Sequence, residues 1–277
     1  MIEILDQNQI IFIVTLMLLS AIFVGFIAGL FGIGGGLIIV PVLFYIFNFV
    51  GLNQEFIMHL AVGTSFSIII PTSIISTMTH LKFKGVDFSI VKTFGIFVIF
   101  GVVLGTIFAA SLKTLSLLLF FSIVTMFISI YFLLEKEKLD TTPRKINLFY
   151  RVFFGSLSGF LSAPMGIGGG IINTPILKMF GYPINIAIGT SAAIGFLISL
   201  IGSIGFIISG TYLDTNVPYS LGFVNIPAFL IYVPVTMFMA KIGARTAHKI
   251  NKKLITKLFG VFLFFISCRL FFEYFSF

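Results

Sequence analysis

Long runs of apolar residues recur from one end of the chain to the other, separated by short polar stretches. The runs cover residues 10–30, 61–79, 94–110, 115–134, 184–209, 223–240 and 258–272. Each holds almost no charge and approaches the ~17 to 25 residues that a helix needs to cross a bilayer. The pattern predicts an all-α polytopic membrane protein with about 8 full spans plus shorter half-helices, and no separate soluble domain.

The second half of the chain repeats the order of small and polar residues in the first half. The Gly-Ile-Gly-Gly-Gly run at 32–36 returns at 166–170, and each copy is followed by a proline, Pro41 or Pro175. Further matches pair Gly63-Thr64-Ser65 with Gly189-Thr190-Ser191, Gly105 with Gly243, and Phe127-Ile128-Ser129 with Phe265-Ile266-Ser267. Ordered matches of this kind indicate an internal repeat. We predict an N-terminal transmembrane repeat at 1–137, a cytoplasmic linker at 138–147 and a C-terminal transmembrane repeat at 148–277.

Each glycine-rich run divides a longer apolar segment from a shorter one. The pieces at 37–50 and 171–180, and the segment at 148–163, are short for a full span at 1.5 Å per residue. We interpret each glycine run as the tip of a hairpin that turns inside the membrane and is followed by three transmembrane helices.

The basic residues lie in the short loops that this topology places on one side of the membrane. They occur at 82–84, 136–151, 178 and 241–253, whereas the opposite side receives little beyond Lys113 and Arg269, together with Asp214 and the acidic N-terminus. Basic loops of membrane proteins accumulate in the cytoplasm. We therefore expect a multi-pass protein of the cytoplasmic membrane with both termini on the non-cytoplasmic side. The two halves then enter the membrane from opposite sides, as inverted-topology repeats.

Composition narrows the function classes. Hydrophobic residues make up 58% of the chain and charged residues 9%, with a mean hydropathy of +1.18, so lipid must be the solvent for most of the surface. The net charge of +8 does not indicate nucleic-acid binding, because topology explains the basic loops. The first apolar run follows Glu3 and Asp6 and no cleavage pattern, so we interpret it as a helix and not as a cleaved signal peptide.

The glycine loops are the first candidate binding site. Glycine allows positive φ and a close approach of the backbone to a ligand, and each loop presents the free amides of the half-helix that follows it. Such an N-terminus can hold an anion without a buried cation. The alternative is that the glycines only permit a tight turn between helices. The candidate substrate-binding residues here are Gly32, Gly34, Gly35, Gly36, Gly166, Gly168, Gly169 and Gly170.

Polar side chains near the loops extend this candidate site. Thr64 and Ser65, with their counterparts Thr190 and Ser191, place hydroxyls near the start of the helix after each hairpin. These hydroxyls either donate to a bound oxyanion or bond to helix carbonyls. Asn173 stands where the first half has Ile39, and we interpret it as a ligand contact or as an interhelical hydrogen bond.

Enzymatic and metal chemistry finds no support in the sequence. No nucleophile elbow, Walker-type loop or His-Glu metal signature occurs, so we expect no catalytic residue, no cofactor and no metal. The single cysteine, Cys268, excludes an intramolecular disulfide. No carboxylate lies in the middle of a predicted span, which argues against a buried acidic proton relay. His59 and His80 are expected at the membrane interfaces, and His248 in a cytoplasmic basic loop.

The duplicated glycine runs, the two Gly-Thr-Ser motifs and the stretch Gly243-Ala244-Arg245-Thr246-Ala247-His248 resemble the TauE/SafE family of sulfite exporters. The most specific piece is Ala163-Pro164-Met165 followed by the glycines at 166–170; the first half has Leu30-Phe31 in place of Pro164-Met165. The resemblance implies a secondary transporter of a small anion, a sulfur oxyanion or an organosulfonate, working with an ion gradient (H⁺ or Na⁺). Its midplane site would lie between the two repeats and work by alternating access. Two other classes stay open: an anion channel with the glycine loops as a constriction, and a membrane scaffold without solute flux.

Overall fold

A computed structural model describes residues 6–52, 54–134, 143–144, 146–213, 217–249 and 252–276, with side chains of the last segment from residue 257. The first half contains α1 (Gln7–Phe31), α2 (Gly36–Phe49), α3 (Ile57–Lys82), α4 (Phe88–Ser111) and α5 (Thr114–Leu134). The second contains α6 (Leu148–Met165), α7 (Gly170–Met179), α8 (Ile184–Tyr212), α9 (Ile226–Ala247) and α10 (Lys252–Ser276). A two-stranded antiparallel ribbon, β1 (Ser220–Leu221) and β2 (Val224–Asn225), precedes α9. Residues 138–142 and 145 of the expected linker lie outside the described residues.

Seven helices in the described part of the chain are long and apolar enough to cross a membrane: α1, α3, α4, α5, α8, α9 and α10. The sequence predicted about eight full spans plus short half-helices. Helix α6, whose segment was judged short for a full span, has 18 residues that include Arg151 and three serines, and it is not among the seven. Large apolar side chains face outward along these helices, for example Phe127 at 69% and Phe265 at 67% exposure. The chain is therefore an all-α, multi-pass membrane protein, as its sequence predicted.

Several helices begin at a side chain that caps their first turn. Asp87 accepts hydrogen bonds from the amides of Ser89 and Ile90 at the start of α4. Asn225 accepts one from the Ala228 amide at the start of α9. These caps satisfy amides that have no acceptor within the helix, so they mark where each span begins after a short loop.

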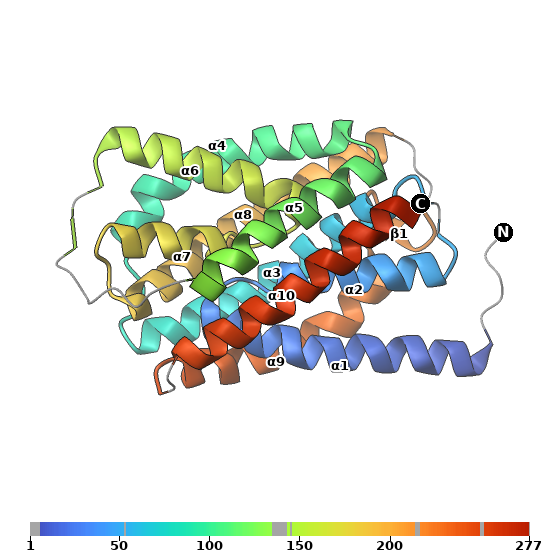
Figure 1. Ribbon diagram of the computed structural model, residues 1–277, viewed down its shortest axis with the longest axis horizontal. Helices are drawn as coiled ribbons and strands as arrows, with labels where there is room; N and C mark the ends of the chain where they lie inside the picture. Colours follow the sequence, from blue (N-terminus) through green and yellow to red (C-terminus); the bar gives the residue numbers. More distant parts are fainter. Residues whose placement is uncertain are drawn as a thin grey trace.

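Helices of the first half pack in pairs against helices of the second half. Helix α1 packs along α9, and its counterpart α6 packs along α4. Helix α3 packs against α8, and α5 packs against α10. Each of these contacts joins one half to the other, so neither half forms a closed bundle by itself. The short helices α2 and α7 lie toward opposite ends of the molecule, whereas α1 begins and α10 ends at the same end (Figure 1).

Glycines allow α1 to pack closely on α9 and α6 to pack closely on α4. A Cβ atom at Gly29 of α1 would overlap the carbonyl oxygen of Ala240 in α9, and one at Gly159 of α6 would overlap that of Val98 in α4. The glycines on the partner helices are equally tight, since a Cβ at Gly243 would overlap the carbonyl oxygen of Phe26. Small residues let helix backbones approach in lipid, where burial of apolar surface provides no driving force between helices.

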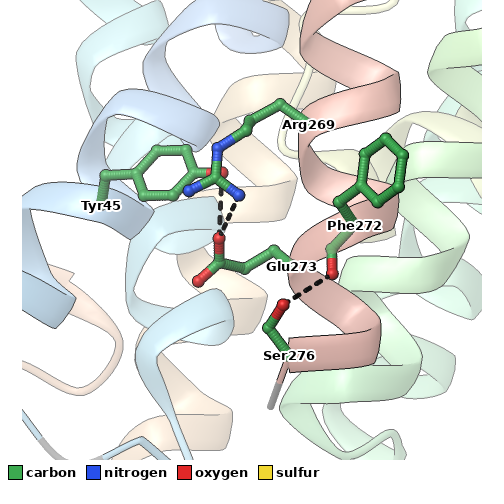
Figure 2. A network of polar contacts seen from close by, with 5 residues as sticks. All are labelled: Tyr45, Arg269, Phe272, Glu273 and Ser276. Carbon is green, nitrogen blue, oxygen red and sulfur yellow. Dashed lines mark hydrogen bonds and ion pairs between the residues drawn. The ribbon is translucent and has the colours of Figure 1, made fainter.

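A charged pair near the end of α10 ties this helix to α2 (Figure 2). The Arg269 guanidinium lies 2.8 Å from the Glu273 carboxylate, one turn further along α10. The same guanidinium stacks over the Tyr45 ring, with 5.3 Å from its carbon to the ring centroid, and the Tyr45 hydroxyl donates to Glu273 at 3.5 Å. Opposite charges one turn apart neutralise each other, so the two charged residues in the last turns of α10 are paired with each other.

We expect Gly29→Ala and Gly159→Ala to lower the thermal unfolding midpoint of the purified protein, because overpacking of this kind costs about 1 to 3 kcal/mol. Gly95→Ala is the matched control: its Cβ would meet only the Leu197 Cδ1 atom, at 2.9 Å, and that side chain can rotate away. Alanine also favours a helix over glycine. The close-packing interpretation is refuted if all three variants unfold at the same temperature.

Candidate functional site

The two glycine loops meet in the centre of the molecule. A Cβ at Gly36 would overlap the carbonyl oxygen of Gly166, and a Cβ at Gly170 would overlap that of Gly32. A Cβ at Gly34 would lie 3.4 Å from the Gly168 Cα atom. The contact is reciprocal, since each loop presents the same positions to the other. Only glycine lets the two backbones come this close.

All the glycines at 32–36 and 166–170 are buried. Gly35 and Gly169 are the N-cap residues of α2 and α7, with φ of +86° and +68° and no side-chain cap. The first amides of a helix have no acceptor within it, and they carry the positive end of the helix dipole. Both short helices therefore point donor-rich N-termini at the contact between the loops.

Neighbouring helices hold each loop from the other half. Ser65 of α3 donates a hydrogen bond to the Gly166 carbonyl oxygen at 2.8 Å. A Cβ at Gly32 would overlap the Ile188 carbonyl oxygen of α8, and one at Gly166 would lie 3.1 Å from the Val62 carbonyl oxygen of α3. The loops are thus packed between α3 and α8.

The hydroxyls selected from sequence have protein partners. Thr64 accepts a hydrogen bond from the Asn225 amide at 2.8 Å, and Thr190 accepts one from the Asp87 amide at 2.9 Å. These bonds link the starts of α9 and α4 to the helix of the opposite half. Ser191 accepts a bond from the Thr174 hydroxyl at 3.0 Å. The structure therefore gives Thr64, Thr190 and Ser191 a structural contact, and their role as ligands stays a prediction.

Asn173 is fully buried in α7, and two serines that the sequence analysis did not select lie beside it. Ser158 of α6 donates to the Asn173 Oδ1 atom at 2.5 Å. Ser162, one turn further along α6, is also fully buried, and its hydroxyl has no hydrogen-bond partner. The available signal was the spacing of four residues, which places both serines on one helix face. The internal repeat strengthened this signal, because the first half has the apolar residues Val24 and Ala28 where the second half has Ser158 and Ser162.

Two histidines near the end of α3 and α9 form a contact that the sequence did not predict. His80 was expected at the membrane interface, but it is fully buried. Its Nε2 lies 3.1 Å from the Gly29 carbonyl oxygen, and its Nδ1 lies 3.1 Å from His248 Nε2. Because a carbonyl only accepts, His80 Nε2 carries the proton in this contact, and in a neutral His80 ring Nδ1 is then the acceptor toward His248 Nε2. The pair therefore links α3 to the end of α9 and, through the Gly29 carbonyl, to α1 three residues before the first glycine loop.

The nearest neighbours of the loop glycines in the described residues are backbone atoms and neutral side chains. The carboxylates that the structure describes are those of Asp6, Glu55, Asp87 and Glu273, and none of them is among the nearest neighbours of the loop glycines. Within the described residues no group of three His, Cys, Asp or Glu side chains could hold a metal ion. The chemistry of the site is therefore that of neutral hydrogen-bond donors.

Comparison with known proteins matches the sulfite exporter TauE/SafE family model to residues 17–270. A probable membrane transporter protein of Haemophilus influenzae is 33% identical over 93% of this chain and 98% of its own length. The probable membrane transporter protein MJ0441 of Methanocaldococcus jannaschii is 30% identical, over 89% and 91%. The probable membrane transporter protein YunE of Bacillus subtilis is 29% identical, over 90% and 94%. No solved structure gives a significant match.

Cysteines introduced together at Gly34 and Gly168 should form a disulfide under mild oxidation in a Cys268→Ser background. A Cβ atom at Gly34 would lie 3.4 Å from the Gly168 Cα atom, and one at Gly168 would lie 3.5 Å from the Gly34 Cα atom. These separations are within the reach of a disulfide. The readout is the mobility of the protein on a gel after cleavage within the linker, with and without reducing agent.

The control pair is Gly51→Cys with Gly168→Cys. Gly51 has φ of +73°, the same as Gly34, so the backbone strain is matched, but nothing lies within 4 Å of its Cβ position. Equal crosslinking of both pairs, or none at 34 and 168, would contradict the contact between the loops.

Proposed function

Because the chain belongs to the sulfite exporter TauE/SafE family of membrane transporters, we propose that it is a secondary transporter of a small anion in the cytoplasmic membrane. The substrate class is a sulfur oxyanion or an organosulfonate, such as sulfite or sulfoacetate. The protein moves this anion without altering it chemically and is not an enzyme. A gradient of H⁺ or Na⁺ drives the movement.

The observation that carries this proposal is the central contact between the two glycine loops, which brings two helix N-termini together between the halves. Positive helix ends and free amides favour an anion over a cation. Neutral donors suffice, because each hydrogen bond to a charged group contributes ~1.5 to 3 kcal/mol. A neutral site also avoids burying an unpaired Lys or Arg in the membrane.

The mechanism that fits this arrangement is alternating access between inverted repeats. The hairpins α1–α2 and α6–α7 extend toward opposite ends of the molecule (Figure 1). The loops at their tips are buried, so the described conformation corresponds in this proposal to an occluded state. Opening toward either side requires one hairpin, with the helix it packs on, to move relative to the other. The close backbone contact at the tips disfavours a continuously open anion channel.

Purified protein in liposomes should carry sulfite or an organosulfonate with saturable flux and should accelerate counterflow when the same anion is present on the far side. The panel is sulfite, sulfate, thiosulfate, taurine and sulfoacetate, measured against protein-free liposomes. Non-saturable flux without trans-stimulation would indicate a channel, and no flux of any anion would refute the proposal.

The inverted topology predicts opposite labelling of two exposed lysine positions. A cysteine at Lys249, after α9, should react with a membrane-impermeant maleimide only from the cytoplasm, and one at Lys113, between α4 and α5, only from outside. Both are tested in the Cys268→Ser background, which serves as the blank. Reaction of both cysteines from the same side of intact cells would exclude the topology.

A further inference from the structure

Two buried polar atoms without a partner lie together at the second hairpin. They are the Asn173 Nδ2 atom and the Ser162 Oγ atom, in residues with 0% exposure. A buried polar group left without a hydrogen bond costs about 1 to 3 kcal/mol. Other unpartnered side-chain atoms in the described residues, such as those of Ser76, Thr77 and Thr125, belong to helices α3 and α5 outside this hairpin. A pair that shares one location therefore needs a specific explanation.

Both atoms border the N-terminus of α7. A Cβ placed on Gly169 would lie 2.9 Å from Asn173 Nδ2 and 3.3 Å from Ser162 Oγ. Gly169 is the N-cap of α7, so the first amides of this helix lie beside the same two atoms. Side-chain donors and backbone donors thus converge on one point.

Ser158 determines what Asn173 offers. Its hydroxyl donates to Asn173 Oδ1, which occupies the acceptor side of the amide and leaves the Nδ2 hydrogens unpaired. An unpaired N–H donor needs an acceptor, so a cation cannot satisfy it. The atom requires an anion or a water molecule.

The first hairpin has the same backbone and none of this chemistry. The positions that match Ser158, Ser162 and Asn173 in the repeat are Val24, Ala28 and Ile39. A Cβ at Gly35 would lie 2.5 Å from Val24 Cγ1 and 3.5 Å from Ala28 Cβ, so apolar groups border the N-terminus of α2. All three residues are buried.

We propose that the two hairpins are unequal, and that the transported oxyanion or sulfonate group is bound by α6–α7 alone, through Ser162 Oγ, Asn173 Nδ2 and the first amides of α7. Ser158 is a positioning residue that orients the Asn173 amide. The first hairpin supplies an apolar wall opposite the bound group. This inference rests on the proposed function and deepens it, because it assigns the anion to one half of the repeat.

The test uses purified full-length Ser162→Ala and Asn173→Leu, with sulfite and sulfoacetate as probes and calorimetry for affinity. Each variant should bind the anion about 10-fold to 100-fold more weakly, the loss expected for one hydrogen bond to a charged group. Without anion, Ser162→Ala should unfold at the same temperature as the wild type or higher, because the change removes a buried hydroxyl that has no partner. Ser158→Ala should weaken binding less than Asn173→Leu, and Ser158→Thr, which keeps the hydroxyl, should restore affinity.

The matched control is Ser76→Ala, which removes another unpartnered buried hydroxyl, in α3, and should leave affinity unchanged. Wild-type affinity in both Ser162→Ala and Asn173→Leu would overturn the inference and show that the two atoms hold water only. A lower unfolding temperature of anion-free Ser162→Ala with unchanged affinity would overturn it in favour of a structural cluster. In both cases wild-type flux stands, so the proposed function survives. Absence of wild-type flux and binding would instead refute the proposed function itself.

Discussion

The direct contact between the backbones of the two glycine loops is the constraint on which the rest of the structure depends. Non-helical backbone at the depth of a membrane is tolerated only where protein or a water-filled cavity surrounds it. Here the two loops bury each other, and the carbonyl oxygens of Gly32 and Gly166 lie against Gly170 and Gly36 of the opposite loop. Any side chain at these positions would separate the hairpins. The helices around them must then close over both loops.

That closure is achieved by contacts that cross between the halves. Close glycine packing holds α1 on α9 and α6 on α4, and hydrogen bonds from the Asn225 and Asp87 amides to Thr64 and Thr190 anchor the loops before α9 and α4. Each contact made by the first half on the second has a counterpart made by the second half on the first. In the mechanism that we propose, rocking one half against the other requires two nearly equivalent sets of packing, and these paired contacts would provide them.

The duplicated architecture is filled with unequal side chains. One hairpin has Val24 and Ala28 behind its glycines, whereas the other has Ser158 and Ser162. In the mechanism that we propose, the similar backbones of the two hairpins allow motion in both directions, whereas a single small anion needs only one set of donors. Additional buried donors in the first hairpin would carry a desolvation cost without a ligand to offset it.

Hydropathy and internal repetition determined the class of fold from the sequence, because a bilayer leaves few choices for a chain with so little charge. The tips of the hairpins were also foreseen, since glycine is needed wherever two backbones touch, and Asn173 was marked by its break in the repeat. The sequence did not reveal that His80 is buried against Gly29 and His248, or that Thr64 and Thr190 accept backbone hydrogen bonds. Nor did it reveal that the Ser162 and Asn173 donors converge without partners. Those facts depend on which residues meet across the halves, and a hydrogen bond between residues far apart in the chain exists only once tertiary packing has set the distance and direction between them.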